Sequence, residues 1–322
     1  MLKKAKLTLI ATVLLSGCSI MENESNKETK SVPEEMEASK YVGQGFQPPA
    51  EKDAIEFAKK HKDKFAKRGE QFFMDNFGLK VKATNVIGSG DGVEVFVHCD
   101  DHDIVFNASI PFDKSIIDSD SSLRSKDKGD DMSTLVGTVL SGFEYRAHKE
   151  ELDNLTEVLK EYKSKYKYTG YTENAIMKTQ NSGFRNEYYY LTAIPYTLDE
   201  YKKYFQPLIK EDDKSFRDGM KNSKKQLKDK SRPYIVTTLF STKDNFTKDN
   251  FTKDNTIDEM IDFSEVLKKK KNIPRDLNVS LQISNKYINT KRPNYSKKDV
   301  IEVGVFNHEK LTRMIKLITI KR

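Results

Sequence analysis

The stretch VEVFVHCDDHDIVFNASIPF, Val93 to Phe112, decides the fold class of this chain. Apolar residues occupy every second place in VEVFVHC, which is the period of a half-buried β-strand. The strand pattern resumes in DIVFNASI, after the polar turn residues Asp100-Asp101-His102. The stretch therefore predicts an antiparallel hairpin with one face against a core.

Segments on either side of this hairpin show helical and further strand periods. In the range 51–76 apolar residues recur at helical spacing, and Gly78 follows as a stop signal. The same spacing predicts helices at 132–146, 149–165, 198–209, 214–228 and 256–270. Strand patterns occur at 79–88, 277–284, 299–306 and 314–320. The sequence thus predicts an α+β fold of antiparallel hairpins packed with amphipathic helices, in a globular domain at 51–322 that could comprise two similar sub-domains, 51–170 and 171–322.

The first residues have the layout of a secretory signal peptide. Lys3, Lys4 and Lys6 precede the apolar run LTLIATVLL, and small residues follow it. The run falls well short of the roughly 20 residues that a helix needs to cross a bilayer. Residues 1–17 are therefore predicted to be a signal peptide and not a permanent span.

The residues Leu15-Ser16-Gly17-Cys18 are similar to the lipobox of bacterial lipoproteins. In that motif the cysteine sulfur receives a diacylglyceryl group, and the signal is cut just before it. The resemblance implies that Cys18 becomes the mature N-terminus and carries the lipid, with palmitate among its acyl chains. Two acyl chains give stable anchoring, since each buried methylene contributes roughly 0.8 kcal/mol. We therefore expect a lipid-anchored protein on the extracellular face of the cell membrane, in which Cys99 has no disulfide partner.

The segment that follows Cys18 reads as a flexible tether. Residues 18–50 contain few apolar side chains, lean towards acidic residues and end in Pro48-Pro49. Such a composition does not offset the entropy lost on ordering. The globular domain is therefore expected to begin at residue 51.

The charge balance argues against a nucleic-acid partner. The chain has 56 Lys and Arg against 49 Asp and Glu, a formal net charge of +7, and the predicted signal peptide holds three of the lysines. Lys alternates with Glu and Asp along most segments, which is the pattern of solvated helix faces. The expected partners are the membrane, through the lipid, and an unknown protein or cell-wall component.

The cluster HCDDHD, His98 to Asp103, is the candidate for metal chemistry. Zinc binds imidazole, thiolate and carboxylate groups, and the candidate ligands are His98, Asp101 and His102. A metal here would make the protein a metal-dependent envelope hydrolase. Against this, strand alternation sends His98 and Cys99 to opposite faces, and Asp is common in hairpin turns. The alternative is an ordinary turn with Cys99 packed inward.

No other motif indicates catalysis. The sequence lacks GxSxG, the set SxxK, SDN and KTG, and HExxH. No cofactor is indicated. The hairpins and helices also differ from the βαβ units of solute-binding transport proteins. The sequence therefore favours a non-enzymatic binding domain and leaves an enzyme as the alternative.

A short repeat interrupts the second half of the chain. The range Ser241 to Asn255 consists of three units that each end in TKDN: STKDN, FTKDN and FTKDN. Its period of five fits neither a helix nor a strand, and the units are far shorter than solenoid repeats. It could be an adhesive loop tip or a tolerated expansion in a surface loop, and the second is favoured.

With the lipobox, the acidic segment, the Phe-rich helix at 51–76 and the hairpin VEVFVHCDDHDIVFNASIPF in view, the chain resembles a family of uncharacterised lipoproteins from Gram-positive bacteria of the staphylococcal type. That family is a domain of unknown function that spans most of the mature protein. The resemblance implies export, lipidation of Cys18 and membrane attachment. It supplies no catalytic residue.

Overall fold

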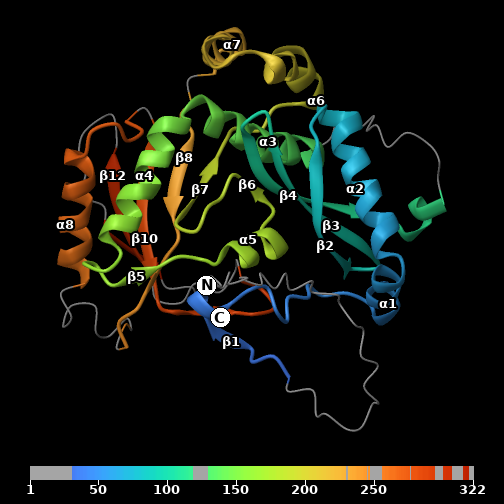
Figure 1. The fold of residues 1–322 in the computed structure, drawn as a ribbon, viewed down its shortest axis with the longest axis horizontal. Coiled ribbons are helices and arrows are strands. Elements are labelled where there is room, and N and C mark those ends of the chain that lie inside the picture. The colour runs from blue at the N-terminus through green and yellow to red at the C-terminus, as the bar shows by residue number, and fades with distance from the viewer. Residues whose placement is uncertain are drawn as a thin grey trace, which may run out of the picture. The chain divides into compact units, whose positions relative to one another are not determined.

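Two large sheets and one short ribbon organise the chain from Val32 onward (Figure 1). The computed structural model describes residues 31–118, 130–229, 231–244, 246, 256–275, 277–293, 300–306 and 315–318. None of the helices in these ranges is both long and apolar enough to cross a membrane. The predicted α+β class is confirmed.

The predicted hairpin lies at the centre of the first sheet. Strand β3 (Gly92–Asp101) pairs with β4 (Ile104–Phe112) in antiparallel register. The two turn residues, His102 and Asp103, have φ angles of 55° and 60°. Two successive positive φ angles suit a tight hairpin because they match the twist of the strands. The sheet order is β2-β3-β4-β6, with β2 at Val81–Ser89 and β6 at Ser182–Gly183.

Helices α1 (Lys52–Lys60), α2 (Lys62–Phe77) and α3 (Asp130–Ala147) pack with this sheet in the first core. The core contains the alternate residues of β3 and large aromatics of the helices: Val93, Val95, Val97, Cys99, Phe65, Phe73, Phe77 and Phe143. Gly69 of α2 permits the close approach, since a Cβ there would lie 2.6 Å from Cγ1 of Val95. The core is closed by α6 (Leu198–Glu200), η3 (Tyr201–Phe205), η4 (Gln206–Lys210) and α7 (Asp213–Gln226).

The helix expected at 51–76 is two helices. His61 separates α1 from α2, and its φ and ψ of −114° and 21° lie outside the helical range. The bend allows both segments to contact β2. Periodicity alone does not reveal it, because the apolar spacing continues across the break.

The second sheet is mixed. Its order is β13-β12-β10-β8-β7, and β9 pairs with β10 and with β5. Strand β10 runs parallel to β8 and β9 and antiparallel to β12, so this sheet is more than a set of hairpins. Its strands are β5 (Tyr168–Thr169), β7 (Tyr189–Thr192), β8 (Tyr234–Thr237), β9 (Leu239–Ser241), β10 (Asn278–Ser284), β12 (Val300–Phe306) and β13 (Ile315–Ile318).

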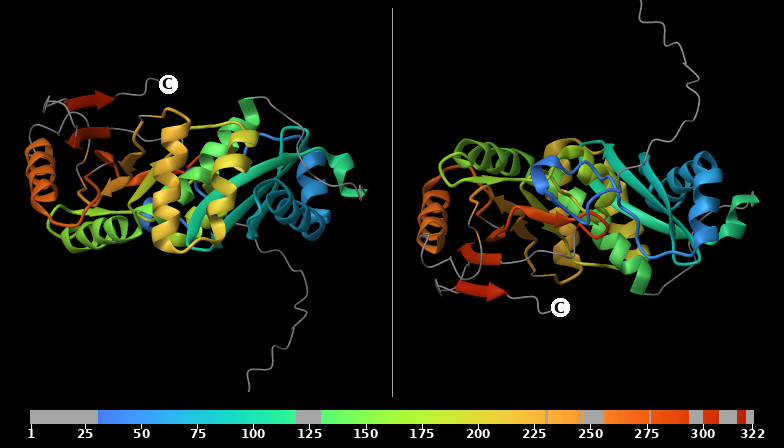
Figure 2. Two further views of the ribbon diagram at one scale, coloured as in Figure 1. Left: turned by 90° about the horizontal axis from the view of Figure 1, so that it is seen from above. Right: turned by 90° about the horizontal axis from the view of Figure 1, so that it is seen from below.

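Helices α4 (Lys149–Tyr162) and α8 (Thr256–Lys269) pack with the second sheet in a second core. Figure 2 shows the unit from above and from below. In both views α8, in orange, lies at one end of the unit, and α1 and α2, in blue, lie at the other. The first core takes α7 from the second half of the chain, and the second core takes α4 from the first half. Each core therefore draws on both of the expected sub-domain ranges, 51–170 and 171–322.

The expectation of a flexible tether is wrong for residues 34–50. Strand β1 (Glu35–Glu37) pairs with β11 (Tyr287–Asn289), and the following turn η1 (Ala38–Lys40) leads to Tyr41, which is fully buried. The Tyr41 hydroxyl donates a 2.8 Å hydrogen bond to the Thr290 carbonyl. These partners lie about 250 residues away, so local composition does not reveal them. The earlier part of the predicted tether, 18–30, lies outside the described residues.

Two further short elements are a helix and a turn. Helix α5 (Glu173–Thr179) shares a third small core with Tyr41. The turn η2 (Lys114–Asp118) follows β4.

We predict that Tyr41→Ala lowers the free energy of unfolding by about 3 to 5 kcal/mol, because it removes a buried aromatic ring. Urea denaturation of residues 19–322 measures this. The neighbouring Val42, which is 39% exposed, provides the control, and Val42→Ala should change the value by no more than about 0.5 kcal/mol. Equal effects of the two substitutions would mean that this segment is a tether after all.

Candidate functional site

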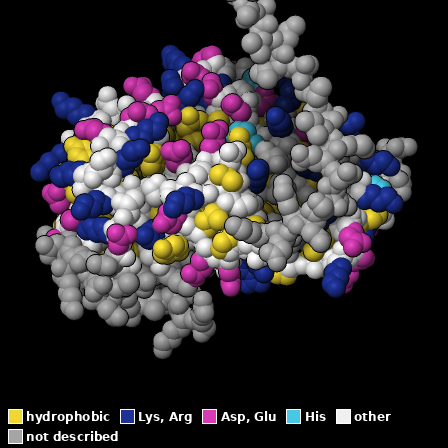
Figure 3. Space-filling model, turned by 60° about the horizontal axis from the view of Figure 1, so that its bottom comes forward, with side chains coloured by type: hydrophobic (Ala, Val, Ile, Leu, Met, Phe, Trp, Pro, Cys, Tyr) yellow, Lys and Arg dark blue, Asp and Glu magenta, His cyan; other side chains and the backbone are white. Residues whose placement is uncertain are grey.

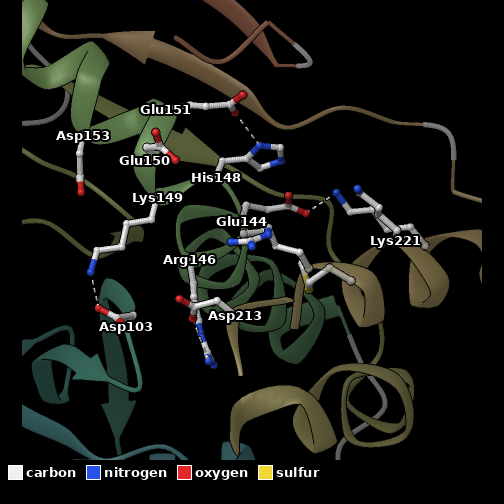
Figure 4. Close-up of a pocket in the computed structure, with 14 residues that line it drawn as sticks. Asp103, Glu144, Arg146, His148, Lys149, Glu150, Glu151, Asp153, Asp213 and Lys221 are labelled. Atoms are coloured by element: carbon white, nitrogen blue, oxygen red, sulfur yellow. Dashed lines mark hydrogen bonds and ion pairs between the residues drawn. The ribbon is translucent and has the colours of Figure 1, made fainter. Parts of the chain in front are cut away.

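A charged cleft lies where the end of α3, the start of α4 and one face of α7 meet the β3–β4 turn (Figure 4). Its volume is about 700 Å³. Pockets of several hundred Å³ are typical of ligand sites. We call this feature the charged cleft and take it as the candidate functional site.

Arg146 anchors the floor of the charged cleft. Its side chain is buried, stacks 4.1 Å over the ring of Phe216 and donates hydrogen bonds to the carbonyls of Ile209 (2.8 Å) and Glu211 (2.6 Å). Its Nη2 lies 3.7 Å from a carboxylate oxygen of Asp213. These contacts hold α3 against the η4–α7 connection, so Arg146 has a structural role in shaping the cleft.

Most other charges of the cleft are paired with the opposite sign. Lys224 of α7 forms an ion pair with the buried carboxylate of Glu144 on α3. Lys149 donates a 2.5 Å hydrogen bond to Asp103, and this contact raises the pKa of the lysine. His148 Nδ1 lies 3.1 Å from Glu151. Such pairs fix the walls of the cleft and leave these groups less available to a ligand.

Two cations on α7 are different. Arg217 and Lys221 line the cleft, are exposed, and form no ion pair with any carboxylate in the described part of the chain. They are four residues apart, so they lie on the same face of the helix. Figure 4 shows Lys221 on the wall opposite Glu150, which is also exposed. The available charges of the cleft are therefore cationic on the α7 wall and anionic on the α4 wall.

The hairpin residues predicted as a metal site do not converge. Asp103 lines the charged cleft, whereas His98 lines a second cavity. His102 is exposed at the turn and lies 2.9 Å from Asp101 of the same turn. His98 and His102 are four residues apart along an extended strand, about 13 Å at 3.3 Å per residue. Within the described residues no group of three or more His, Cys, Asp or Glu side chains could hold a metal ion.

Cys99 packs inward, as strand alternation predicts. It is fully buried in the first core, and burial raises the pKa of its thiol to about 12. A thiol with such a pKa is a poor nucleophile and a poor metal ligand near neutral pH. Cys99 is therefore part of the core and not of a reactive site.

Several sequence-derived sites lie outside the described residues. They include Cys18 and all but Ser241–Asp244 and Phe246 of the pentapeptide repeat. Three residues of the charged cleft, Arg146, Arg217 and Lys221, were not predicted from the sequence. Their only signal is the i, i+4 spacing of two cations on a predicted helix, which is typical of any solvated helix face.

Charge is mixed on the face of the molecule that Figure 3 draws. On the face drawn in Figure 3, Lys and Arg side chains alternate with Asp and Glu, and neither sign forms a continuous patch. The charged cleft differs from this background because its unpaired charges are separated by sign. This arrangement suits a ligand or partner that carries charge.

Comparison with known proteins identifies one family and one solved structure. The family model "Protein of unknown function (DUF1672)" matches residues 28–310. A crystal structure of a DUF1672 family protein from Staphylococcus aureus is 95% identical in sequence, with a TM-score of 0.84, and the match covers 87% of this chain and all of that chain. No match was found among curated proteins. The expected resemblance is confirmed, and the chain belongs to the DUF1672 family.

Proposed function

We propose that this protein is a cell-envelope lipoprotein, anchored through Cys18 to the outer face of the plasma membrane, whose domain binds a protein or cell-wall component without catalysis. The anchoring rests on the three N-terminal lysines, the short apolar run and the LSGC motif. With the ordered domain beginning near residue 34, the segment available as a tether runs from Cys18 to about residue 33. A tether of that length keeps the domain close to the membrane, about 20 to 25 Å on average.

The unpaired cations of the charged cleft support the binding role. Arg217 and Lys221 are held side by side on α7, which packs into the first core through Phe216 and Met220. Because the helix is fixed by this packing, the two charges need no rearrangement to meet a partner. Their chemistry favours a partner with phosphate or carboxylate groups, such as an anionic wall polymer or an acidic protein segment.

The anchor is tested by replacing the sulfur that would carry the lipid. Cys18→Ala should abolish incorporation of labelled palmitate and move the protein from the membrane fraction to the culture medium. The neighbouring substitution Ser19→Ala serves as control and should leave both unchanged. Palmitate labelling that persists in the Cys18→Ala protein would contradict lipidation at this residue.

The charged cleft is tested by reversing its two free cations. We expect Arg217→Glu/Lys221→Glu to weaken sedimentation of residues 19–322 with isolated cell walls by about tenfold, since each exposed pair contributes up to roughly 1 kcal/mol. The double variant Lys59→Glu/Lys60→Glu, on exposed positions of α1, changes the net charge equally and should bind like the parent. Walls stripped of their phosphate polymers should bind neither the parent nor the control variant well. Equal binding by the two variants would contradict the cleft as the binding surface.

A further inference from the structure

A second cavity lies on the other face of the first sheet from the helices of the first core. It is lined by residues of β3, β4, α4, α5 and the β6–β7 turn, and has a volume of about 320 Å³, or roughly ten water molecules. We call it the β3–α5 cavity. Its size fits a molecule as large as an amino acid or a dipeptide.

Asn107 lines this cavity and carries one donor that has no partner among the described residues. It is 1% exposed and lies in register between His98 of β3 and Gly183 of β6. Its Oδ1 lies 3.0 Å from Nδ1 of His98 and, as an amide oxygen, can only accept a hydrogen bond. Its Nδ2 is buried and has no partner among the described residues. A buried amide donor left in this state is destabilising, and a ligand acceptor would offset that cost.

Arg185 supplies a second donor and a positive charge. Its guanidinium lies 4.6 Å from the ring centre of Tyr171 and 5.4 Å from that of Tyr190, and Nη1 donates to Oε1 of Gln180. Its Nε is buried without a partner, and none of the ion pairs in the described chain includes this residue. Burial lowers the pKa of the guanidinium, as expected for a cation with no carboxylate beside it.

The backbone holds Arg185 in place through the next residue. Oδ1 of Asn186 accepts hydrogen bonds from the backbone N–H groups of Tyr188 (2.9 Å) and Tyr189 (3.0 Å). Nδ2 of Asn186 donates to Oγ1 of Thr156 on α4 at 2.9 Å. The turn is thus tied to α4 on one side and to β7 on the other, and a cation without a carboxylate partner on a rigid turn is prepared for an anion.

The remaining wall combines two carboxylates with apolar groups. Glu173 and Glu187 line the cavity, and neither forms an ion pair within the described chain. Ile176, Met177 and Tyr188 supply the apolar part. Lys160 also lines the cavity but pairs with Glu157 at 2.8 Å. A cation outside any ion pair, two carboxylates outside any ion pair and an apolar wall therefore occur together among the described residues of one small cavity.

We propose that the β3–α5 cavity binds the zwitterion of a small apolar amino acid or dipeptide. Asn107 and Arg185 bind its carboxylate, Glu173 and Glu187 bind its ammonium group, and the apolar wall contacts its side chain. This site is separate from the charged cleft and from the anchor, so its failure would leave the proposed envelope role intact.

The test observes the two free donors directly. In ¹⁵N-labelled residues 19–322, which retain the whole unit from Val32 onward, the side-chain N–H signals of Asn107 and Arg185 are followed by NMR during titration with L-leucine. Both signals should shift, and the shifts should saturate by about 10 mM leucine, which corresponds to a dissociation constant in the millimolar range or below. Leucine methyl ester lacks the carboxylate and N-acetyl-leucine lacks the ammonium group, so each should bind at least tenfold more weakly, by about the loss of one charged hydrogen bond.

Variants and a second ligand complete the design. Arg185→Gln should abolish the shift of Asn107, whereas Arg232→Gln, which removes an exposed cation that lines neither the β3–α5 cavity nor the charged cleft, should leave it unchanged. A titration with the dipeptide Ala-Leu shows whether the cavity prefers an amino acid or a dipeptide, since the preferred class is the one that binds more tightly. If Arg185→Gln does not fold, the ester and acetyl ligands still decide on the parent protein. Absence of saturation with both leucine and Ala-Leu, or equal binding of the ester, would overturn the proposal.

Discussion

The alternation of β3 is the constraint on which the rest of the structure depends. Val93, Val95, Val97 and Cys99 point into the first core, and burying each aliphatic side chain contributes roughly 1.5 to 3 kcal/mol. A shift of one residue in register would expose this set and bury Glu94 and His98 instead. The register is therefore strongly fixed. It also determines which residues of β3 lie on the face opposite the first core. His98 reaches the β3–α5 cavity for this reason, while the turn at Asp103 reaches the charged cleft.

Much of the fold follows from short-range pattern in the sequence. The hairpin and the helix α8 lie where period and turn residues place them, because each buries one face. Strand β10 also lies where its period places it, although its polar residues Ser280 and Ser284 are buried as well. What the sequence did not reveal depends on distant partners. Met36 and Tyr41 are buried or partly buried only because β11 and Thr290 lie beside them, and β10 is parallel to β8 only because the chain crosses over through α8.

The candidate sites were harder to predict, because they also depend on residues that are distant in the sequence. HCDDHD looks like one cluster in sequence, but a strand of alternating faces followed by a turn sends its members to the core, to one cavity and to a cleft. Arg185 lies in FRNEYYY, three residues before a run of tyrosines. Tyr188 and Tyr189 of this run are buried. That Arg185 has no carboxylate partner becomes visible only when its neighbours in space are known. A charged residue in a run of core aromatics is the signal that could have drawn attention to it.

The ligand site proposed in the β3–α5 cavity depends on one donor without a partner on the polar face of the first sheet, Nδ2 of Asn107. A long-range ¹H–¹⁵N spectrum of the His98 ring at pH 8.5 tests this, because it reports which ring nitrogen carries the hydrogen. We expect the tautomer with hydrogen on Nδ1, donating to Oδ1 of Asn107, so that Nδ2 of Asn107 has no partner. The opposite tautomer, with hydrogen on Nε2, would mean that the amide is turned and donates to His98, which would contradict the proposal.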